Sequence, residues 1–457
     1  MTVTSTTTSS DSLFLPDSTP AAAGSVQRCE SCGAELAELE AAPACPACGG
    51  LLSIIHRRPV DELGRQLGAP ALALDWQRHC TSLSSGVWRF RSLVMPGAGD
   101  AVVSHPEGNT PLLQRSRLEA FTGCRELLVK HEGYNPTGSF KDRGMTVAAT
   151  QARRIGAAAV ACASTGNTSA SLAAYAAQAG IPGLVFVPAG RVALGKMAQT
   201  LAYGARTLLV RGDFDDCLRL AQQASKELGI YLLNSINPWR IEGQKTIVLE
   251  MLQQLDWNAP DFIVLPAGNL GNTSAFGKAL REAYALGLIS RLPRLVSVQA
   301  AGAAPFARSF REDFATRYSV QAETIATAIR IGDPASWNRA VRSIRETNGL
   351  VLEVTDNEIL EAKAAVDASG VGCEPASAAS IAGVRQLVDT GVTGSSDRVV
   401  AVLTGHVLKD PGILVEMHQT REDFANANKP LEIDADIRAV ERVLNSSESL
   451  SGFPLSH

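Results

Sequence analysis

The sequence lacks a surplus of charge of one sign, a long apolar run and a basic leader. Its 42 Lys and Arg residues against 46 Asp and Glu give a formal net charge of -4, so the composition does not favour nucleic-acid binding. No apolar run approaches the ~20 residues that a membrane span needs. Residues 1–26 contain no Lys or Arg and lack the basic-then-apolar order of a secretion signal. We therefore expect a cytoplasmic protein that binds neither nucleic acid nor membrane.

Disulfide bonds are not indicated, because the nine cysteines are placed for another purpose. Four of them form two Cys-x-x-Cys pairs, each followed by glycine: Cys29, Cys32, Cys45 and Cys48. This spacing is typical of a zinc ribbon, in which four thiolates complete a structural tetrahedral site. Two redox-active pairs are the alternative, but no thioredoxin-like strand and helix surrounds either pair. The remaining cysteines are scattered, as expected for small core residues: Cys80, Cys124, Cys162, Cys217 and Cys373.

One lysine stands where a short apolar strand gives way to a helix. Residues 126–132 are predicted to form the strand and residues 140–155 the helix, which places Lys141 in the first helical turn. The partial positive charge of a helix N-terminus lowers the affinity of Lys141 for its proton. A lysine that attacks a carbonyl group needs this property. The alternative is an exposed lysine balanced by Asp142.

A second strand-to-helix turn has the sequence Ser164-Thr165-Gly166-Asn167-Thr168. It follows a predicted strand at 158–164 and opens a helix, so free N–H groups and hydroxyls gather there. Such a turn can bind a carboxylate. An ordinary helix N-cap is the alternative.

A third turn, Gly268-Asn269-Leu270-Gly271-Asn272-Thr273, lies between a predicted strand at 262–265 and a helix that includes 276–284. Its glycines allow the backbone to approach a phosphate closely, and the helix N-terminus favours the negative charge. It is not a dinucleotide fingerprint, because the third glycine is missing at the required spacing. A plain turn is the alternative.

Two more segments carry polar groups at ends of predicted elements. Thr404 follows a predicted strand at 398–403, and ligands of open α/β sheets bind at such carboxyl ends. Ser235 and Arg240 lie together at a strand-to-helix junction, where a hydroxyl and a guanidinium can bind a phosphate ester. The alternative is a solvated loop in which Arg240 pairs with Glu242.

These motifs resemble those of the fold-type II pyridoxal phosphate enzymes, and the segment from Asn135 to Gly144 is similar to that of the threonine synthase family. The resemblance covers roughly residues 28–415, and many family members carry a similar ribbon. It implies cofactor-binding residues, of which Lys141 is the covalent one: Lys141, Asn167, Gly268, Asn269, Leu270, Gly271, Asn272 and Thr404. It also implies catalytic Lys141 and Thr168, and substrate contacts from Ser164, Thr165, Ser235 and Arg240. The family usually has a smaller residue where Leu270 stands.

The alternation of short strands and helices from about residue 112 to 404 indicates an α/β fold of the doubly wound type. By resemblance we expect two open α/β domains with the cofactor in the cleft between them, preceded by the zinc ribbon. The expected ranges are a disordered tail at 1–27, the ribbon at 28–56, a helical segment and the start of the large domain at 57–125, the small domain at 126–235, the rest of the large domain at 236–420 and a C-terminal tail at 421–457.

The resemblance implies an enzyme that uses pyridoxal 5'-phosphate as cofactor. It would convert O-phospho-L-homoserine and water to L-threonine and phosphate by γ-elimination and β-addition of water, with zinc as a structural ion. A phosphoserine-using β-replacement enzyme such as cysteate synthase and a threonine dehydratase are the alternatives within this fold. A binding protein that uses the ribbon is the alternative from another class. Lys196 and Lys245 are rival lysines, and the role of the motif that starts at Glu374 is not assigned. A homodimer is left open.

Overall fold

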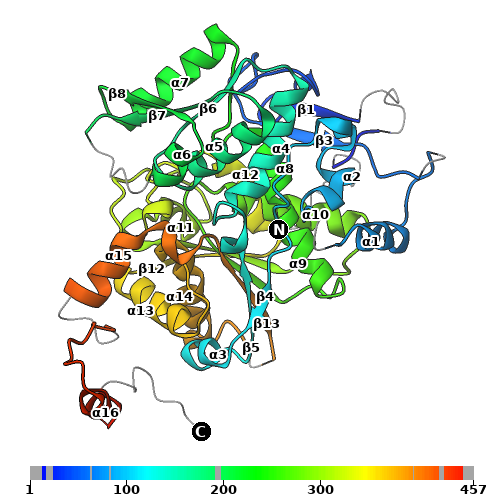
Figure 1. Ribbon diagram of the computed structural model, residues 1–457. Coiled ribbons are helices and arrows are strands. Elements are labelled where there is room, and N and C mark those ends of the chain that lie inside the picture. Colours follow the sequence, from blue (N-terminus) through cyan, green and yellow to red (C-terminus); the bar gives the residue numbers. More distant parts are fainter. Residues whose placement is uncertain are drawn as a thin grey trace. The chain divides into compact units, whose positions relative to one another are not determined.

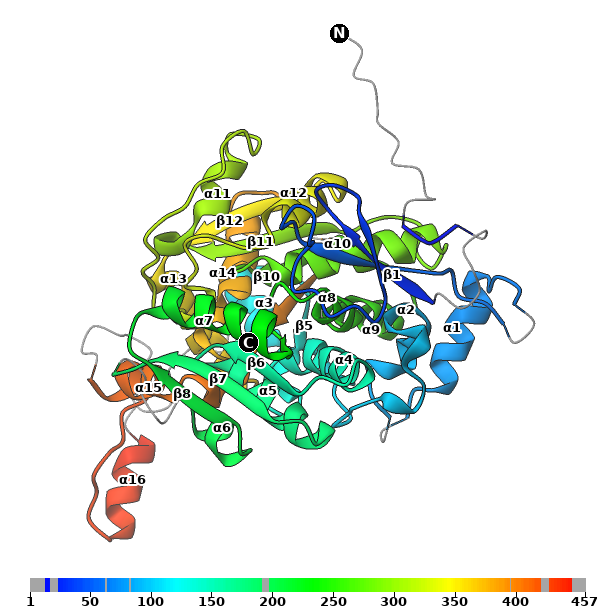
Figure 2. The ribbon, with the colours of Figure 1, turned by 90° about the horizontal axis from the view of Figure 1, so that it is seen from above.

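The computed structural model describes residues 13–16, 24–61, 64–81, 84–190, 197–394, 396–420 and 427–445. The chain divides into two units, residues 1–409 and residues 410–457. The first unit holds three β-sheets, whose strands appear in Figures 1 and 2. The expected tail at 1–27 falls mostly outside the described residues. Within it, however, Phe14 and Leu15 are buried, and Ser25 already begins strand β1.

The largest sheet has six strands in the order β12-β11-β10-β13-β5-β4. All neighbours run parallel except β4, which is antiparallel to β5. The strands are β4 (Leu112–Gln114), β5 (Glu126–His131), β10 (Phe262–Pro266), β11 (Arg294–Ala300), β12 (Leu350–Val354) and β13 (Arg398–Leu403). Strand β5 falls in the range expected for the small domain, yet it pairs within this sheet.

A second sheet has four parallel strands in the order β8-β7-β6-β9. They are β6 (Ala159–Ala163), β7 (Gly183–Pro188), β8 (Arg206–Val210) and β9 (Ile230–Leu232). The chain therefore leaves the large sheet after β5, builds the small sheet and returns at β10. Two parallel sheets of this kind make the mixed α/β architecture that the sequence predicted.

Helices cover the sheets and connect their strands. In the first unit they are α1 (Ala69–Arg78), α2 (Arg91–Val94), α3 (Ser116–Thr122), α4 (Lys141–Arg154), α5 (Asn167–Ala179), α6 (Ala198–Ala202), α7 (Phe214–Leu228), α8 (Pro238–Gln244), α9 (Thr246–Gln254), α10 (Gly271–Ala285), α11 (Pro305–Phe310), α12 (Trp337–Glu346), α13 (Asp356–Ala368) and α14 (Pro375–Asp389). The second unit contains α15 (Pro411–Val415) and α16 (Ile437–Asn445). No helix within the part of the chain that the structure describes is both long and apolar enough to cross a membrane.

The central strands are apolar along their whole length because both of their faces are buried. In β10, Phe262 and Val264 pack into the core formed with α3, α13 and α14, whereas Ile263 and Leu265 pack into the core on the opposite face. Successive strand residues point to opposite faces, so such a strand has no polar face. This burial fixes where each strand ends and hence where the polar turns that follow it lie.

The N-terminal sheet, β2-β1-β3, is antiparallel and comprises β1 (Ser25–Cys29), β2 (Glu35–Ala37) and β3 (Leu52–His56). Strand β3 packs on α8, and the labels of the two elements lie close together in Figure 1. The His56 ring is buried there, with Nε2 2.7 Å from a Glu242 carboxylate oxygen and Nδ1 2.9 Å from the Ser25 hydroxyl. Burial lowers the pKa of His56, so the neutral ring donates to Glu242 and accepts from Ser25.

Candidate active site

Lys141 is the first residue of α4, as the strand-to-helix pattern predicted. The turn before it is tied to the end of strand β13. The Phe140 N–H donates to the Thr404 carbonyl at 3.0 Å, and the His406 N–H donates to the Gly138 carbonyl at 2.9 Å. These bonds hold Lys141 beside Thr404, at the carboxyl end of strand β13. The two residues are 263 positions apart in the sequence.

The pKa of Lys141 is lowered to about 7 from an ordinary 10.5, first because the amine is buried and second because of the positive charge of Arg240. The Glu374 carboxylate acts in the opposite direction. The direction agrees with the sequence prediction, but the main causes are burial and Arg240 rather than the helix N-terminus. A large fraction of the Lys141 side chain is therefore the neutral amine near pH 7.

Asp142 does not balance Lys141, because its carboxylate is used elsewhere. It accepts from the Thr137 N–H at 2.7 Å, from the Thr137 hydroxyl at 2.6 Å and from the Ser171 hydroxyl at 2.6 Å. Burial raises the pKa of Asp142 to about 6. The network fixes the turn before Lys141 to helix α5 and leaves the lysine amine available.

The turn at Ser164–Thr168 opens α5, whose first residue is Asn167. No side chain caps this helix start, and a Cβ added at Gly166 would meet no atom within 4 Å. Ser164, Thr165 and Thr168 are partly exposed. The Asn167 amide donates to a Glu374 oxygen at 2.8 Å, which joins the small-sheet side of the site to helix α14. This helix start therefore has open space and unused donors for an anion.

Thr404 is buried at the end of β13, and its hydroxyl lies 3.0 Å from a Glu374 oxygen and 3.0 Å from the Ser377 hydroxyl. Glu374 is the residue just before α14, and Ser377 lies in its first turn. Burial raises the pKa of Glu374, and the hydrogen bonds from Asn167 and Thr404 act against that rise. Glu374 thus connects two residues that the sequence assigned to cofactor binding.

The turn at Gly268–Thr273 opens α10, with Gly271, Asn272 and Thr273 as its first three residues. Leu270 precedes the helix and has a φ of 62°, in the left-handed region that residues with large side chains disfavour. The smaller residue that the family usually has at this position would adopt this backbone more easily. The Leu270 side chain does not cap the helix, and space remains beside Gly271, where an added Cβ would meet only a Gln244 oxygen at 3.6 Å. The first N–H groups of α10 are therefore free to bind a phosphate.

The Asn269 side chain is hydrogen-bonded on both sides within the protein. Its amide donates to the Ser235 hydroxyl at 2.7 Å, and its oxygen accepts from the Ala335 N–H at 2.8 Å. Asn269 therefore brings the third turn next to the segment that was predicted to bind a substrate phosphate.

Arg240 is fully buried on α8, and the only hydrogen bond of its guanidinium among the described residues runs from Nη1 to the Leu233 carbonyl at 3.1 Å. Its Nε and Nη2 have no partner there. Burial lowers the pKa of Arg240 to about 10. The predicted alternative, a pair with Glu242, is wrong, because Glu242 pairs with His56, Lys245 and Lys278. A buried guanidinium with unused donors is the condition for binding an anionic ligand.

The rival lysines do not compete with Lys141. Lys245 is buried and paired with Glu242 at 2.6 Å and with Glu282 at 2.7 Å, which raises its pKa. Lys196 lies outside the described residues. Of Lys141 and Lys245, only Lys141 combines a lowered pKa with a position at a strand-to-helix turn.

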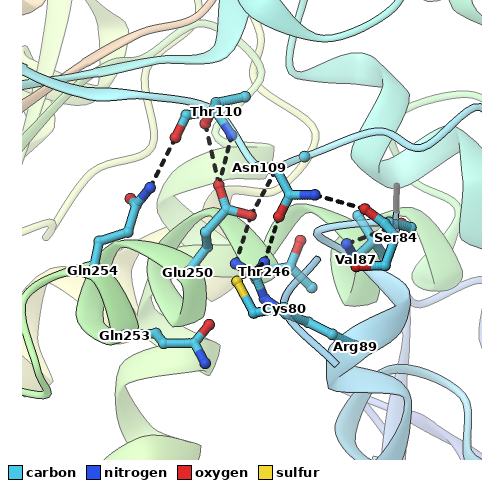
Figure 3. Close-up of polar contacts among 12 residues, drawn as sticks. Cys80, Ser84, Val87, Arg89, Asn109, Thr110, Thr246, Glu250, Gln253 and Gln254 are labelled. Atoms are coloured by element: carbon cyan, nitrogen blue, oxygen red, sulfur yellow. Dashed lines mark hydrogen bonds and ion pairs between the residues drawn. The ribbon is translucent and has the colours of Figure 1, made fainter. Parts of the chain in front are cut away.

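A separate buried charge cluster fixes the helix that carries Lys141. Glu250 accepts from the N–H groups of Asn109 and Thr110 at 2.8 and 2.9 Å and pairs with Arg89 at 2.9 Å (Figure 3). It also pairs with Arg143 of α4 at 2.8 Å. Each charged side chain named here has an ion-pair partner, and Arg89 Nε is the one nitrogen of these groups without a hydrogen bond among the described residues. The paired charges indicate a structural cluster. Sequence reasoning missed it, since its members are far apart in the chain.

The four cysteines of the ribbon converge as their spacing predicted. The sulfur atoms of Cys29, Cys32, Cys45 and Cys48 all lie within 4.8 Å of one another. Gly33 and Gly49 follow the pairs with φ 72° and 73°, a conformation that glycine adopts without strain. The arrangement is a four-thiolate cluster of the size that one tetrahedral metal ion needs.

Residues 103–405 match the model of the family described as pyridoxal-phosphate dependent enzyme. The match includes the six-stranded and the four-stranded sheet, together with Lys141, Arg240, Glu374 and Thr404. The chain belongs to this family.

Within that family its relatives are threonine synthases. The chain is 45% identical to the threonine synthase of Methanosarcina acetivorans over 419 residues, which are 91% of this chain and 98% of that protein. It is 52% identical to the threonine synthase of Mycobacterium leprae over 307 residues, 67% of this chain and 83% of that protein. The crystal structure of Escherichia coli threonine synthase shares the fold, with a TM-score of 0.65 at 19% identity over 92% of this chain and 99% of that one. The chain is thus a member of the threonine synthase family.

Proposed function

We propose that the chain converts O-phospho-L-homoserine and water to L-threonine and phosphate, as a pyridoxal phosphate-dependent lyase. The observation that carries the substrate assignment is Arg240. Its buried Nε and Nη2 have no partner among the described residues, and Ser235 lies in the same strand-to-helix junction. A phosphate ester supplies the charge and the acceptors that this guanidinium lacks. A dehydratase substrate has no phosphate and would leave Arg240 unpaired.

The residues present fit the cofactor. Lys141 would hold its aldehyde carbon, the N–H groups of Gly271 to Thr273 its phosphate, Asn167 its phenolate oxygen and Thr404 its ring nitrogen. Gly268, in the same turn, has no room for a side chain, because an added Cβ would lie 2.9 Å from the Ile329 backbone. Pyridoxal phosphate, when bound, withdraws electrons from the carbon skeleton of an attached amino acid.

The chain's own groups then move protons and hold charge. The neutral Lys141 amine would take a proton from the substrate α-carbon, pass it on within the site, and then take one from the β-carbon. Water supplies the hydroxyl of the β-carbon and gives its remaining proton to the departing phosphate. The two protons taken by Lys141 end on the α- and γ-carbons of threonine. Arg240 and Ser235 hold the phosphate as it leaves the γ-carbon. The helix start at Ser164, Thr165 and Thr168 holds the substrate carboxylate, and Thr168 faces the reacting carbons. Burial around Lys141 and Arg240 strengthens these interactions by excluding water.

Two measurements test this proposal. Borohydride reduction of the holoenzyme should fix the cofactor on a peptide that contains Lys141, and label on Lys245 would contradict the site. A steady-state phosphate-release assay should show higher kcat/KM with phosphohomoserine than with phosphoserine. The reverse preference would favour the β-replacement reaction instead.

We also propose that the four-cysteine cluster binds one structural zinc ion. The four sulfur atoms lie within 4.8 Å of one another, close enough for one tetrahedral ion to bind all of them. Metal analysis of the purified protein should find one zinc per chain. Cys32→Ser should lower stability more than the turnover of the folded enzyme, and loss of chemistry on chelation without unfolding would contradict a structural role.

A homodimer, a cytoplasmic location and the domain limits given above remain predictions. Gel filtration with light scattering checks the first. Limited proteolysis, with the cleavage sites identified by mass, checks the third.

A further inference from the structure

Glu374 was singled out in the sequence without a role, and the structure places it at the centre of the proposed cofactor site. It is buried, and its two oxygens have different partners. One accepts from the Asn167 amide at 2.8 Å, and the other lies 3.0 Å from the Thr404 hydroxyl. Nothing in the reaction described above uses this carboxylate.

The position of each hydroxyl proton follows from counting donors and acceptors. The Ser377 oxygen accepts from the N–H groups of Thr404 and Gly405 at 2.8 and 3.0 Å, so both of its lone pairs are used. Among the described residues the acceptor left for its own proton is the Thr404 oxygen at 3.0 Å. The proton of Thr404 therefore points to Glu374, and one lone pair of Thr404 remains.

Resting on the site assigned under the proposed function, we propose that Glu374 is a positioning residue that makes Thr404 present a lone pair, not a proton, to the cofactor ring nitrogen. An acceptor at this place hydrogen-bonds a protonated ring nitrogen and leaves an unprotonated one without a donor. The hydrogen bonds that run from Ser377 through Thr404 to Glu374 are called the relay below. Through this relay the neutral Thr404 hydroxyl favours a protonated ring nitrogen, as an aspartate does in other sites.

The surroundings of Glu374 bear on its charge. Burial opposes the ionised carboxylate, whereas Lys409, which lies after β13, favours it. Lys141 of α4 favours it too, but only while the amine is protonated, below its pKa of about 7. In the preceding residue, Cys373, the carbonyl accepts from the Lys363 ammonium at 2.8 Å and the N–H donates to Asp367 at 3.1 Å. The relay has the stated direction when Glu374 is ionised, so the test is made on the mildly alkaline side of neutrality.

The test uses holoenzyme loaded with pyridoxal phosphate that carries ¹⁵N at the ring nitrogen, observed by NMR. Wild type should show the chemical shift of a protonated nitrogen, and Glu374→Gln should shift it to the unprotonated value. The glutamine oxygen must accept from Asn167, so its amide donates to Thr404 and frees the Thr404 proton for the ring. Glu361→Gln, which changes an exposed carboxylate on α13, is the matched control and should leave the signal unchanged.

An unprotonated nitrogen in wild type, or the same signal in wild type and Glu374→Gln, would overturn the proposal. Should Glu374→Gln fail to fold, wild type alone still gives an answer. A cofactor analogue with C–H in place of the ring nitrogen should bind at least about tenfold more weakly than pyridoxal phosphate, and equal binding would count against the relay. If Thr404→Val leaves the nitrogen signal unchanged, Thr404 does not face the ring. In that case the site assignment has failed together with the relay, whereas reduction at Lys141 separately tests the proposed function.

Discussion

Two fully buried arginines, Arg143 and Arg240, sit on neighbouring helices and differ in what surrounds them. Arg143 pairs with Glu132 at 2.6 Å and with Glu250 at 2.8 Å, and these carboxylates raise its pKa. Arg240 has one backbone carbonyl as partner and a lowered pKa. Burial alone therefore does not reveal function. In this pair, the charge of Arg143 is matched within the fold, and we propose that the unused donors of Arg240 bind a ligand.

The largest effect is expected for the saturated arginine. Arg143→Met leaves Glu132 without its ion-pair partner and should lower the free energy of unfolding by about 3–5 kcal/mol. Urea unfolding of wild type and variant measures this. Arg398→Met, which removes an exposed pair with Glu126, is the control and should cost less than about 1 kcal/mol. A cost for Arg143→Met no larger than that of the control would contradict the contrast.

Arg240→Met should act on catalysis instead. It removes a buried charge that lacks a carboxylate partner, so stability should stay the same or rise. The kcat/KM for phosphohomoserine should fall at least roughly tenfold, because charge-assisted hydrogen bonds to the phosphate are lost. The cofactor absorbance should not change, since the proposed cofactor phosphate site is at Gly271–Thr273. Unaltered kcat/KM, or loss of bound cofactor, would show that the substrate phosphate is placed wrongly.

Arg240→Lys should recover part of this loss. An ammonium keeps the charge but lacks the planar fork that binds two phosphate oxygens at once. Its kcat/KM should lie between those of wild type and Arg240→Met when all three are measured with phosphohomoserine. Full recovery would mean that charge alone is recognised.

The last prediction concerns pH. The folded-state pKa of Lys141 is about 7 and its ordinary value is 10.5. Between these pH values the unfolded chain binds a proton that the folded apoprotein does not, so the free energy of unfolding should rise with pH across this range. The difference between wild type and Lys141→Met isolates the effect. In an Arg240→Met background the rise should begin at higher pH, because one cause of the low pKa is gone. A pH-independent difference would refute the burial of Lys141.

Local patterns in the sequence predicted the strands and helix starts of the site, but not the hydrogen bonds and ion pairs between residues far apart in the chain. The strand at 398–403 and the helix that carries Lys141 are found where the apolar periodicity placed them. The partners of Asn167 could not be predicted in this way, because Glu374 is 207 residues distant in sequence. The same holds for Arg143 and Glu250, 107 residues apart. Such contacts depend on how the sheets pack and leave no periodic signal.

The bond between His56 and Glu242 has a consequence for how the chain folds during synthesis. The two residues are 186 positions apart, so the ribbon is made well before its docking helix exists. Domains fold in order from the N-terminus during synthesis. We therefore expect the ribbon to bind its proposed metal ion on its own and to remain undocked while the small sheet is synthesised. Arg240 stands two residues before Glu242 on the same helix. The docking of the first-made part of the chain therefore fixes the helix that carries the arginine proposed to bind the substrate phosphate.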